Sequence, residues 1–235
     1  MNNLHMKTVI LAGGKGQRLA PFTTNFPKPL MPVGERPILE ILLERLKAEG
    51  LTDIIIATGH LEELIRAYFG DGSKWGLKIA YSKEDKPLGT AGPLDLVRNE
   101  LTDTFLLVNG DTLSDIHFRD LIRCHVGNSS SATVALSRRK VSIDFGVVET
   151  DGDNRIVAWK EKPNIDFLVS TGIYVFSPQV LSMLPSREFI DLPNFLLKLQ
   201  AAGYRVSGYV HEGYWLDIGR PEDYREACRD VEKQV

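Results

Sequence analysis

The sequence contains little cysteine and no long apolar run. Its two cysteines, Cys124 and Cys228, are too few for a disulfide framework or a four-cysteine zinc site, which favours a reducing compartment. The apolar run nearest the N-terminus, residues 9–12, is shorter than the core of a signal peptide. No later segment approaches the roughly 18 apolar residues that span a membrane. These absences predict a soluble, cytoplasmic protein without a membrane partner.

An excess of positive charge is also missing. The chain has 28 Lys and Arg residues against 31 Asp and Glu, so its formal net charge is −3 at pH 7. This balance argues against a protein that coats nucleic acid, although it is compatible with a local basic pocket for a phosphate ligand. Hydrophobic residues make up 43% of the 235 positions, which is ordinary for a globular protein with a sizeable core.

Short apolar strands alternate with helical patterns through the first half of the chain. Strands that are apolar on both faces and separated by helices predict a parallel sheet covered on both sides. After about residue 130 the pattern changes to strand-like pieces joined by turns. We therefore expect one α/β domain over residues 1–235, with a mixed, mostly parallel sheet and helices on both faces. Residues 1–130 would form a Rossmann-like half, and residues 131–235 a more β-rich half. The predicted strands are 8–12, 53–58, 77–81, 104–108, 132–137, 145–149, 156–161 and 171–176, and the predicted helices are 37–50, 61–69, 90–99, 193–202 and 221–233.

A glycine-rich loop follows the first predicted strand. Gly13, Gly14 and Gly16 allow positive φ angles and let backbone N–H groups approach an anion. Arg18 and Lys28 add two cations, and the prolines on either side of Lys28 stiffen its backbone. The loop lacks the ending of a P-loop and the third small residue of a dinucleotide fingerprint, which argues against a nicotinamide dehydrogenase. The alternative is a tight turn between a strand and a helix.

Other candidate residues are polar and lie near the ends of predicted strands. Asp111 follows the fourth predicted strand, where an open parallel sheet places its ligand crevice. Taken alone, Asp111 and Asp217 are equally typical of turns, and the pair Glu161 and Lys162 is typical of a solvated face. Thr90 is also suited to cap the N-terminus of the predicted helix 90–99.

Taken together, these segments resemble the sugar-nucleotide pyrophosphorylases, the nucleotidyltransferases that make an NDP-sugar and pyrophosphate from a sugar 1-phosphate and an NTP. The likeness departs from the family pattern at Gln17, where many members carry threonine, and at Ser170, where many carry asparagine. It covers nearly the whole chain and rests on residues 11–19 (LAGGKGQRL), 27–38, 109–111, 145–146, 161–163, 171–174 and 215–221.

The resemblance implies a Rossmann-like nucleotide-diphospho-sugar transferase fold and a role for each matching residue. Arg18, Lys28 and Asp111 would be catalytic, and Asp111 and Asp217 would bind Mg²⁺ as the cofactor. The nucleotide would be bound by Leu11, Ala12, Gly13, Gly14, Gly16, Pro87, Gly89 and Thr90. In the β-rich, sugar-binding half, the sugar phosphate would be bound by Gly146, Glu161, Lys162 and Thr171.

The base and the sugar are indicated by residues 87–94, PLGTAGPL, which are similar to the corresponding segment of mannose-1-phosphate guanylyltransferases. We therefore expect GTP as the nucleotide, and mannose 1-phosphate or manno-heptose 1-phosphate as the sugar phosphate. The compact length also resembles that of heptose-1-phosphate guanylyltransferases. Uridylyl or thymidylyl transfer is the alternative reaction, and a non-catalytic subunit that senses an NDP-sugar is the alternative role. A homo-oligomer is compatible with the resemblance.

Overall fold

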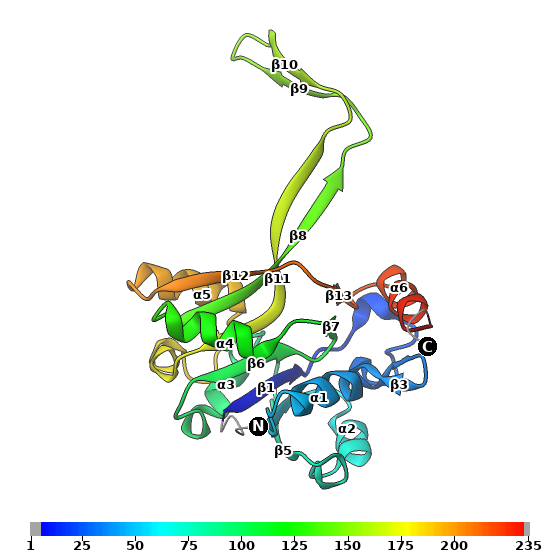
Figure 1. Ribbon diagram of the computed structural model, residues 1–235, viewed down its shortest axis with the longest axis vertical. Helices are drawn as coiled ribbons and strands as arrows, with labels where there is room; N and C mark the ends of the chain where they lie inside the picture. The colour runs from blue at the N-terminus through cyan, green and yellow to red at the C-terminus, as the bar shows by residue number, and fades with distance from the viewer. Residues whose placement is uncertain (1–5, 233–235) are drawn as a thin grey trace.

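A seven-stranded mixed sheet forms the centre of the molecule in the computed structural model, which describes residues 6–232 (Figure 1). Its strand order is β12-β8-β11-β6-β1-β4-β5, and among these seven strands only β11 runs against its neighbours. The predicted α/β class with a mostly parallel sheet is therefore confirmed. The strands are β1 (Lys7–Ala12), β4 (Asp53–Thr58), β5 (Lys78–Lys83), β6 (Phe105–Asn109), β8 (Ala132–Ser142), β11 (Asn164–Phe176) and β12 (Val206–His211).

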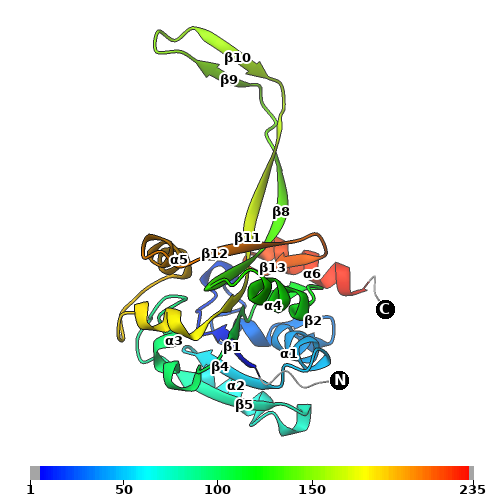
Figure 2. The same cartoon turned by 60° about the vertical axis from the view of Figure 1, so that its left-hand side comes forward.

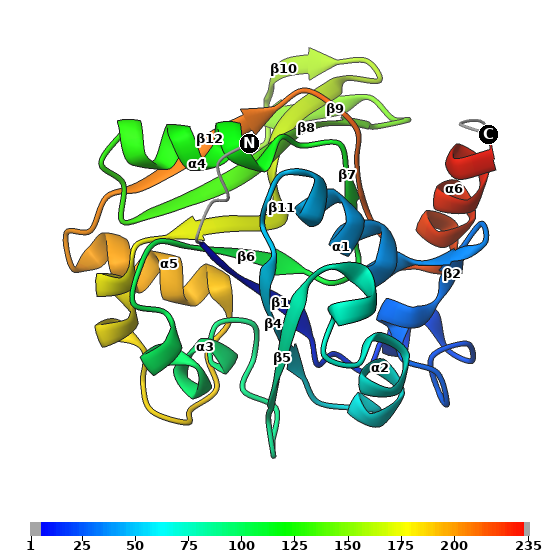
Figure 3. The same cartoon turned by 60° about the horizontal axis from the view of Figure 1, so that its bottom comes forward.

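Helices cover both faces of the sheet because its central strands carry apolar side chains at consecutive positions. In β4, Ile54 and Ile56 face one hydrophobic core and Ile55 faces the other. The first core is covered by α1 (Ile38–Ala48), α2 (Glu62–Phe69) and α4 (Phe118–Gly127), and the second by α3 (Pro93–Leu96) and α5 (Leu192–Ala201) (Figure 3). Within residues 6–232, every helix is too short or too polar to span a membrane.

A third apolar cluster joins the short strands that flank the sheet to the last helix. The strands pair as β2 (Pro32–Val33) with β3 (Arg36–Pro37), and β7 (Thr112–Ser114) with β13 (Trp215–Asp217). Helix α6 (Pro221–Glu232) packs on them through Ala227, which is fully buried beside Leu216 and Ile218. This cluster brings the segment after β6 next to the segment after β13.

The ends of α1 follow from its local sequence. The sequence suggested Pro37 as the first helical residue. In the structure Pro37 is the N-cap residue, with an extended backbone, and the helix begins one position later at Ile38. At the other end, Gly50 has a φ of 80°, which a residue with a side chain rarely adopts, and its N–H donates to the carbonyl of Lys47 at 2.9 Å. The helix therefore stops where the sequence predicts.

Several elements differ from the sequence-based prediction. The helix predicted over 90–99 is only α3, which is followed by a 3-10 turn, and its N-cap is Gly92 rather than Thr90. The strand β12 and the helix α4 were not predicted. The strands β8 and β11 are much longer than 132–137 and 171–176, because each continues past the edge of the sheet.

These continuations form an arm, residues 138–170, that projects from the body (Figures 1 and 2). Its stem is the outer part of the β8–β11 ladder, which pairs Leu136 with Ser170 and Ser142 with Asn164 at its two ends. Its tip is a second hairpin, β9 (Val147–Thr150) with β10 (Ile156–Lys160). No hydrogen bond or ion pair within residues 6–232 joins residues 143–163 to the body. Nine large apolar side chains of the arm are exposed: Val141, Phe145, Val148, Ile156, Val157, Trp159, Ile165, Phe167 and Leu168.

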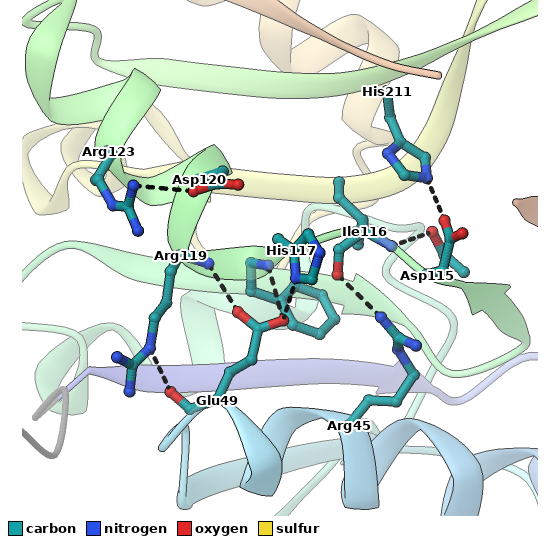
Figure 4. A network of polar contacts seen from close by, with 11 residues as sticks. Arg45, Glu49, Asp115, Ile116, His117, Arg119, Asp120, Arg123 and His211 are labelled. Carbon is teal, nitrogen blue, oxygen red and sulfur yellow. Dashed lines mark hydrogen bonds and ion pairs between the residues drawn. The ribbon is translucent and has the colours of Figure 1, made fainter. Parts of the chain in front are cut away.

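A polar network ties the end of α1 to the start of α4 (Figure 4). The carboxylate of Glu49 accepts the backbone N–H of Phe118 at 3.2 Å and of Arg119 at 2.9 Å. The guanidinium of Arg119 donates to the carbonyl of Glu49 at 3.0 Å, and that of Arg45 donates to the carbonyl of Ile116 at 3.1 Å. The side chain of Glu49 therefore satisfies helix donors that the N-cap residue of α4 leaves without a side-chain partner.

Candidate functional site

A cleft of about 1190 Å³ lies at the carboxyl ends of β1, β4, β5 and β6. An open parallel sheet places its ligands at this edge. A second cavity of about 170 Å³, between α1 and β7, is too small for a nucleotide. The large cleft brings together most of the residues that the sequence singled out, and they line it as follows: Leu11, Ala12, Gly13, Gly14, Gly16, Arg18, Lys28, Pro87, Gly89, Thr90 and Asp111.

The glycine-rich loop forms one wall of this cleft. Gly16 has a φ of 60°, and its carbonyl accepts the hydroxyl of Thr23 at 2.8 Å. A Cβ at Gly16 would lie 3.0 Å from the Thr23 side chain, so this position requires glycine for both its backbone angle and its packing. Within residues 6–232, the N–H groups of Gly14 and Gly16 donate to no other residue. The loop therefore presents free backbone donors to the cleft, as an anion-binding nest does.

Lys28 and Asp111 meet on the floor of the cleft. The ammonium group of Lys28 forms an ion pair with Oδ2 of Asp111, and their side chains are only 10% and 25% exposed. The other carboxylate oxygen of Asp111, Oδ1, is buried and has no hydrogen-bond partner within residues 6–232. A buried carboxylate oxygen without a donor is costly unless a cation or a donor from a ligand completes it.

Asp217 lies beside Asp111 because β13 pairs with β7. The ladder aligns Asp217 with Thr112, and the N–H of Ile218 donates to the carbonyl of Asp111 at 3.2 Å. Burial raises the pKa of Asp217, the Asp111 carboxylate raises it further, and Lys28 and Arg18 oppose the shift. Two neighbouring carboxylates, one with an unpartnered oxygen, make a donor set that suits a divalent cation such as Mg²⁺.

Arg18 reaches the same end of the cleft from the glycine-rich loop. A Cβ at Gly219 would lie 3.4 Å from the Nη2 atom of Arg18 and 3.5 Å from Oδ2 of Asp217. No hydrogen bond or ion pair within residues 6–232 holds its guanidinium. The side chain therefore keeps its donors available at the position where Asp217, Asp111 and Lys28 converge.

Two residues that the sequence did not suggest hold the loops of the cleft together. One is Glu84, whose carboxylate accepts the N–H of Leu88 at 3.0 Å, and whose pKa is raised by burial. A Cβ at Gly13 would lie 2.9 Å from this carboxylate, and a Cβ at Gly59 would lie 3.1 Å from it. A charged residue just after a strand is common on surfaces, so no local signal in the sequence distinguishes Glu84.

The other such residue is Asp191, which secures the loop containing Thr90. Its carboxylate accepts the N–H of Thr90 at 3.3 Å, and the hydroxyl of Thr90 accepts the N–H of Leu192 at 2.8 Å. The interpretation of Thr90 as the cap of its own helix is therefore wrong, because this hydroxyl serves the N-terminus of α5. The loop also needs Gly89, with a φ of 79°, since a Cβ there would lie 2.6 Å from the carbonyl oxygen of Ile190.

The predicted sugar-phosphate residues do not line the cleft. Gly146, Glu161 and Lys162 lie in the arm, where a Cβ at Gly146 would sit 2.9 Å from Oε2 of Glu161. Thr171 is buried at the base of the arm, and its hydroxyl donates to the carbonyl of Ala135 at 2.9 Å. The structure therefore divides the predicted site into a nucleotide part in the body and a sugar part in the arm, and these roles stay predictions.

The mixed seven-stranded sheet, with a cleft at the carboxyl ends of its parallel strands, defines an α/β protein with the fold of the sugar nucleotidyltransferases. The sequence profile of the family described as "Nucleotidyl transferase" matches residues 7–234. The chain belongs to this family.

The relatives of the chain differ in the nucleotide that their names give. A UTP–glucose-1-phosphate uridylyltransferase of Synechocystis is 36% identical over 96% of this chain and 63% of its own length. A mannose-1-phosphate guanylyltransferase of Mycobacterium tuberculosis is 36% identical over 97% of this chain and 65% of its own length. A D-glycero-alpha-D-manno-heptose 1-phosphate guanylyltransferase of Aneurinibacillus thermoaerophilus is 30% identical over 98% of this chain and 100% of its own length. The chain thus spans less than two thirds of the length of the first two relatives.

Solved structures share the fold over nearly the whole chain. A Bacillus anthracis protein named as a glucose-1-phosphate thymidylyltransferase superposes with a TM-score of 0.77 at 27% identity, covering 98% of this chain and 96% of that one. HddC from Yersinia pseudotuberculosis, complexed with GMP-PN, superposes with a TM-score of 0.73 at 25% identity, covering 96% of this chain and 99% of that one.

Proposed function

We propose that this chain is a sugar-1-phosphate guanylyltransferase, which makes a GDP-sugar and pyrophosphate from GTP and mannose 1-phosphate or manno-heptose 1-phosphate. The observation that carries the reaction type is the cleft in which a glycine-rich loop, two cations and two neighbouring carboxylates meet. In this reaction an oxygen of the sugar 1-phosphate attacks the α-phosphorus of GTP, and the bond from that phosphorus to the bridging oxygen of pyrophosphate breaks. The nucleophile is already an anion, so the site needs no general base.

The residues of the cleft suit the task of bringing two polyanions together. The free N–H groups of Gly14 and Gly16 would bind phosphate oxygens of the triphosphate, and Arg18 and Lys28 would neutralise its charge. Positioning and charge neutralisation account for most of the catalysis in phosphoryl-type transfers. The volume of about 1190 Å³ exceeds the roughly 300–1000 Å³ of typical single-ligand pockets, which leaves room for both substrates.

A magnesium ion is the cofactor that these carboxylates would hold. Asp111 would bind it through the buried oxygen that has no partner within residues 6–232, and Asp217 would supply a second carboxylate. Mg²⁺ is commonly held by one or two carboxylates together with substrate phosphates, and it would supply further neutralisation of phosphate charge here. Lys28 now occupies one oxygen of Asp111, so the ion and Lys28 would share that carboxylate.

The preference for GTP has its own support. Four residues of the segment 87–94 line the cleft, where they would lie beside the base: Pro87, Gly89, Thr90 and Pro93. Two of the three relatives described above are named guanylyltransferases, and the HddC structure contains GMP-PN. Against this, the Synechocystis relative of equal identity is named a uridylyltransferase, so uridylyl transfer is the second candidate.

A five-nucleotide panel tests the proposal. Purified protein is incubated with Mg²⁺, one of GTP, UTP, dTTP, CTP or ATP, and either mannose 1-phosphate or manno-heptose 1-phosphate, and pyrophosphate release is measured. We expect the highest kcat/KM with GTP. Preference for UTP or dTTP would overturn the guanylyl assignment while leaving the reaction class standing. Binding of a GDP-sugar without pyrophosphate release from any pair would identify a sensing subunit instead.

A further inference from the structure

The arm exposes about as much apolar surface as the largest apolar patches of typical monomers. Phe145 is 78% exposed, Trp159 60% and Phe167 48%, and six aliphatic side chains of the arm are also exposed. Aromatic side chains of about 150–250 Å² each and aliphatic ones of roughly 100 Å² give on the order of 600 Å² of exposed apolar surface. The largest apolar patch of a typical monomer is about 300–600 Å² and is often an interaction site. The arm is therefore a candidate interaction surface.

A second copy of the chain is the partner that this area fits. Two arms together would contribute roughly 1,200 Å² from these side chains alone, which reaches the lower bound of about 1,200–2,000 Å² for specific interfaces. The arm also carries six basic and six acidic residues over 138–170, so two copies would meet without net repulsion.

The stem of the arm limits what the tip can reach. Its two strands pair continuously from Leu136 and Ser170 to Ser142 and Asn164, and the ladder shifts register only nearer the body, between Ser170 and Tyr174. Six residues of paired strand extend about 20 Å. The stem therefore carries the tip hairpin, β9 and β10, well away from the seven-stranded sheet of its own chain (Figure 2).

Exposed aromatic side chains lie on the cleft and in a segment that flanks it. Phe189 lines the cleft and is 63% exposed. Phe22 and Phe26, which lie in the chain between the cleft-lining residues Arg18 and Lys28, are 60% and 41% exposed. A single interface made twice by a two-fold axis would cover both the arm and the cleft mouth of each chain.

We propose that two copies of this chain exchange arms, so that the tip of each arm docks at the mouth of the other copy's cleft. The exchange would bring Glu161 and Lys162 of one chain to the cleft of the other chain. Their role in binding the sugar phosphate there rests on the proposed function. Each active site is then shared between two chains, and a single chain holds only the nucleotide part.

Sedimentation tests the association without any need for activity. We expect the wild type to be a dimer, and the variant Ile156→Ser/Val157→Ser to dissociate at least tenfold more readily, because these two side chains are 61% and 62% exposed and would be buried at the interface. The matched control is Val126→Ser, a 64% exposed position on α4, which should stay dimeric. Hydrogen exchange in the segments 20–27 and 188–191 should rise in the double variant and not in the control. A monomeric wild type, or a dimer whose cleft-mouth segments exchange unchanged in the double variant, would overturn the proposal.

Mixing two inactive variants tests the sharing of the site. Lys162→Ala and Arg18→Ala should each be nearly inactive, but their mixture should recover about a quarter of the wild-type rate, since random pairing makes half the dimers mixed and each mixed dimer holds one intact site. No recovery after mixing, with exchange of subunits verified by sedimentation of tagged chains, would mean that each arm serves its own cleft. An inactive wild type that still dimerises through the arm would reject the proposed function and not the exchange.

Discussion

Lys28 and Asp111 form an ion pair although they lie 83 positions apart in the chain. Lys28 comes from the short 3-10 turn Lys28–Leu30, and Asp111 follows β6, so the pair connects the loop after the glycine-rich segment to the centre of the sheet. Both side chains are largely buried, and only one oxygen of Asp111 is engaged. The pair is therefore both a structural link and the point at which charge is balanced in the cleft.

The first prediction concerns this pair. Lys28→Met should lower the free energy of unfolding by about 3 kcal/mol without ligands, because it removes the cation that pairs with the largely buried Asp111 carboxylate. Urea denaturation followed by circular dichroism measures the change. Lys78→Met is the matched control, since Lys78 is 76% exposed and pairs with Asp53 at 3.6 Å, and it should cost at most about 1 kcal/mol. Equal effects of the two substitutions would contradict the structural role of Lys28.

The second prediction separates a catalytic Arg18 from one that braces its loop. Within residues 6–232 no hydrogen bond or ion pair holds the guanidinium, so Arg18→Ala should leave the melting temperature unchanged. It should lower kcat and kcat/KM together by roughly 10²–10³, the cost of losing one pre-organised electrostatic contact. Arg18→Lys should recover only part, because lysine lacks the planar fork.

Steady-state kinetics with thermal melting measures both effects of Arg18→Ala. Arg36→Ala, at an exposed arginine that pairs with Glu44, is the control and should change neither. A large fall in melting temperature in Arg18→Ala with a near-normal kcat would support the bracing role instead.

The third prediction concerns the cap that Glu49 gives to α4. Glu49→Ala should lower the free energy of unfolding by about 1–2 kcal/mol, because the backbone donors of Phe118 and Arg119 lose their acceptor. Glu49→Gln should lose less, since its amide oxygen still accepts one of them. Glu44→Ala, at a half-exposed position of α1, should stay within about 0.5 kcal/mol of the wild type. If Glu49→Ala proves as stable as Glu44→Ala, the cap contributes nothing to the free energy of unfolding.

The fourth prediction is a pH dependence of stability that arises at His125. Burial lowers the pKa of His125, and both ring nitrogens contact hydroxyl groups, of Thr133 at 2.9 Å and of Ser177 at 3.0 Å. The unfolded chain therefore binds a proton at higher pH than the folded one does. The stability from a neutral His125 is fully present above about pH 6.5 and declines as the pH falls below that value, by at most about 1.4 kcal/mol per pH unit.

Denaturation of His125→Gln between pH 8 and pH 5 checks this prediction, because the variant should lose that part of the slope. His117→Gln, at a 78% exposed side chain, is the control and should keep it. A slope that is unchanged in His125→Gln would assign the pH dependence to other groups.

The glycine-rich wall of the cleft was predictable because its signals are local. Gly13, Gly14 and Gly16 follow one another directly after a strand, and the strand 53–58 was predicted at its observed bounds because it is apolar on both faces. The pairing of Lys28 with Asp111 was not predictable, because the fold alone brings these residues together. Glu84 and Asp191 escaped prediction because each acts through a contact with a segment brought close only by the fold. The arm was not predicted for a related reason. The hydrophobic pattern and composition indicate that residues 145–149 and 156–161 are strands, but they do not indicate that these strands lie outside the central sheet.

The direction of β11 has a consequence for how the chain could be re-engineered. Because β8 leaves the sheet and β11 returns beside it in the opposite direction, residues 138–170 depart and re-enter at adjacent points of the ladder. The whole segment is thus an insertion with neighbouring ends, which folded domains tolerate well. It can be exchanged as one cassette for the corresponding segment of a relative, joined at Ser137 and Thr171, while the strands that carry the cleft keep their register. Under the proposed function, such a chimera would separate the contribution of the arm to the choice of sugar from the contribution of the cleft to the choice of nucleotide.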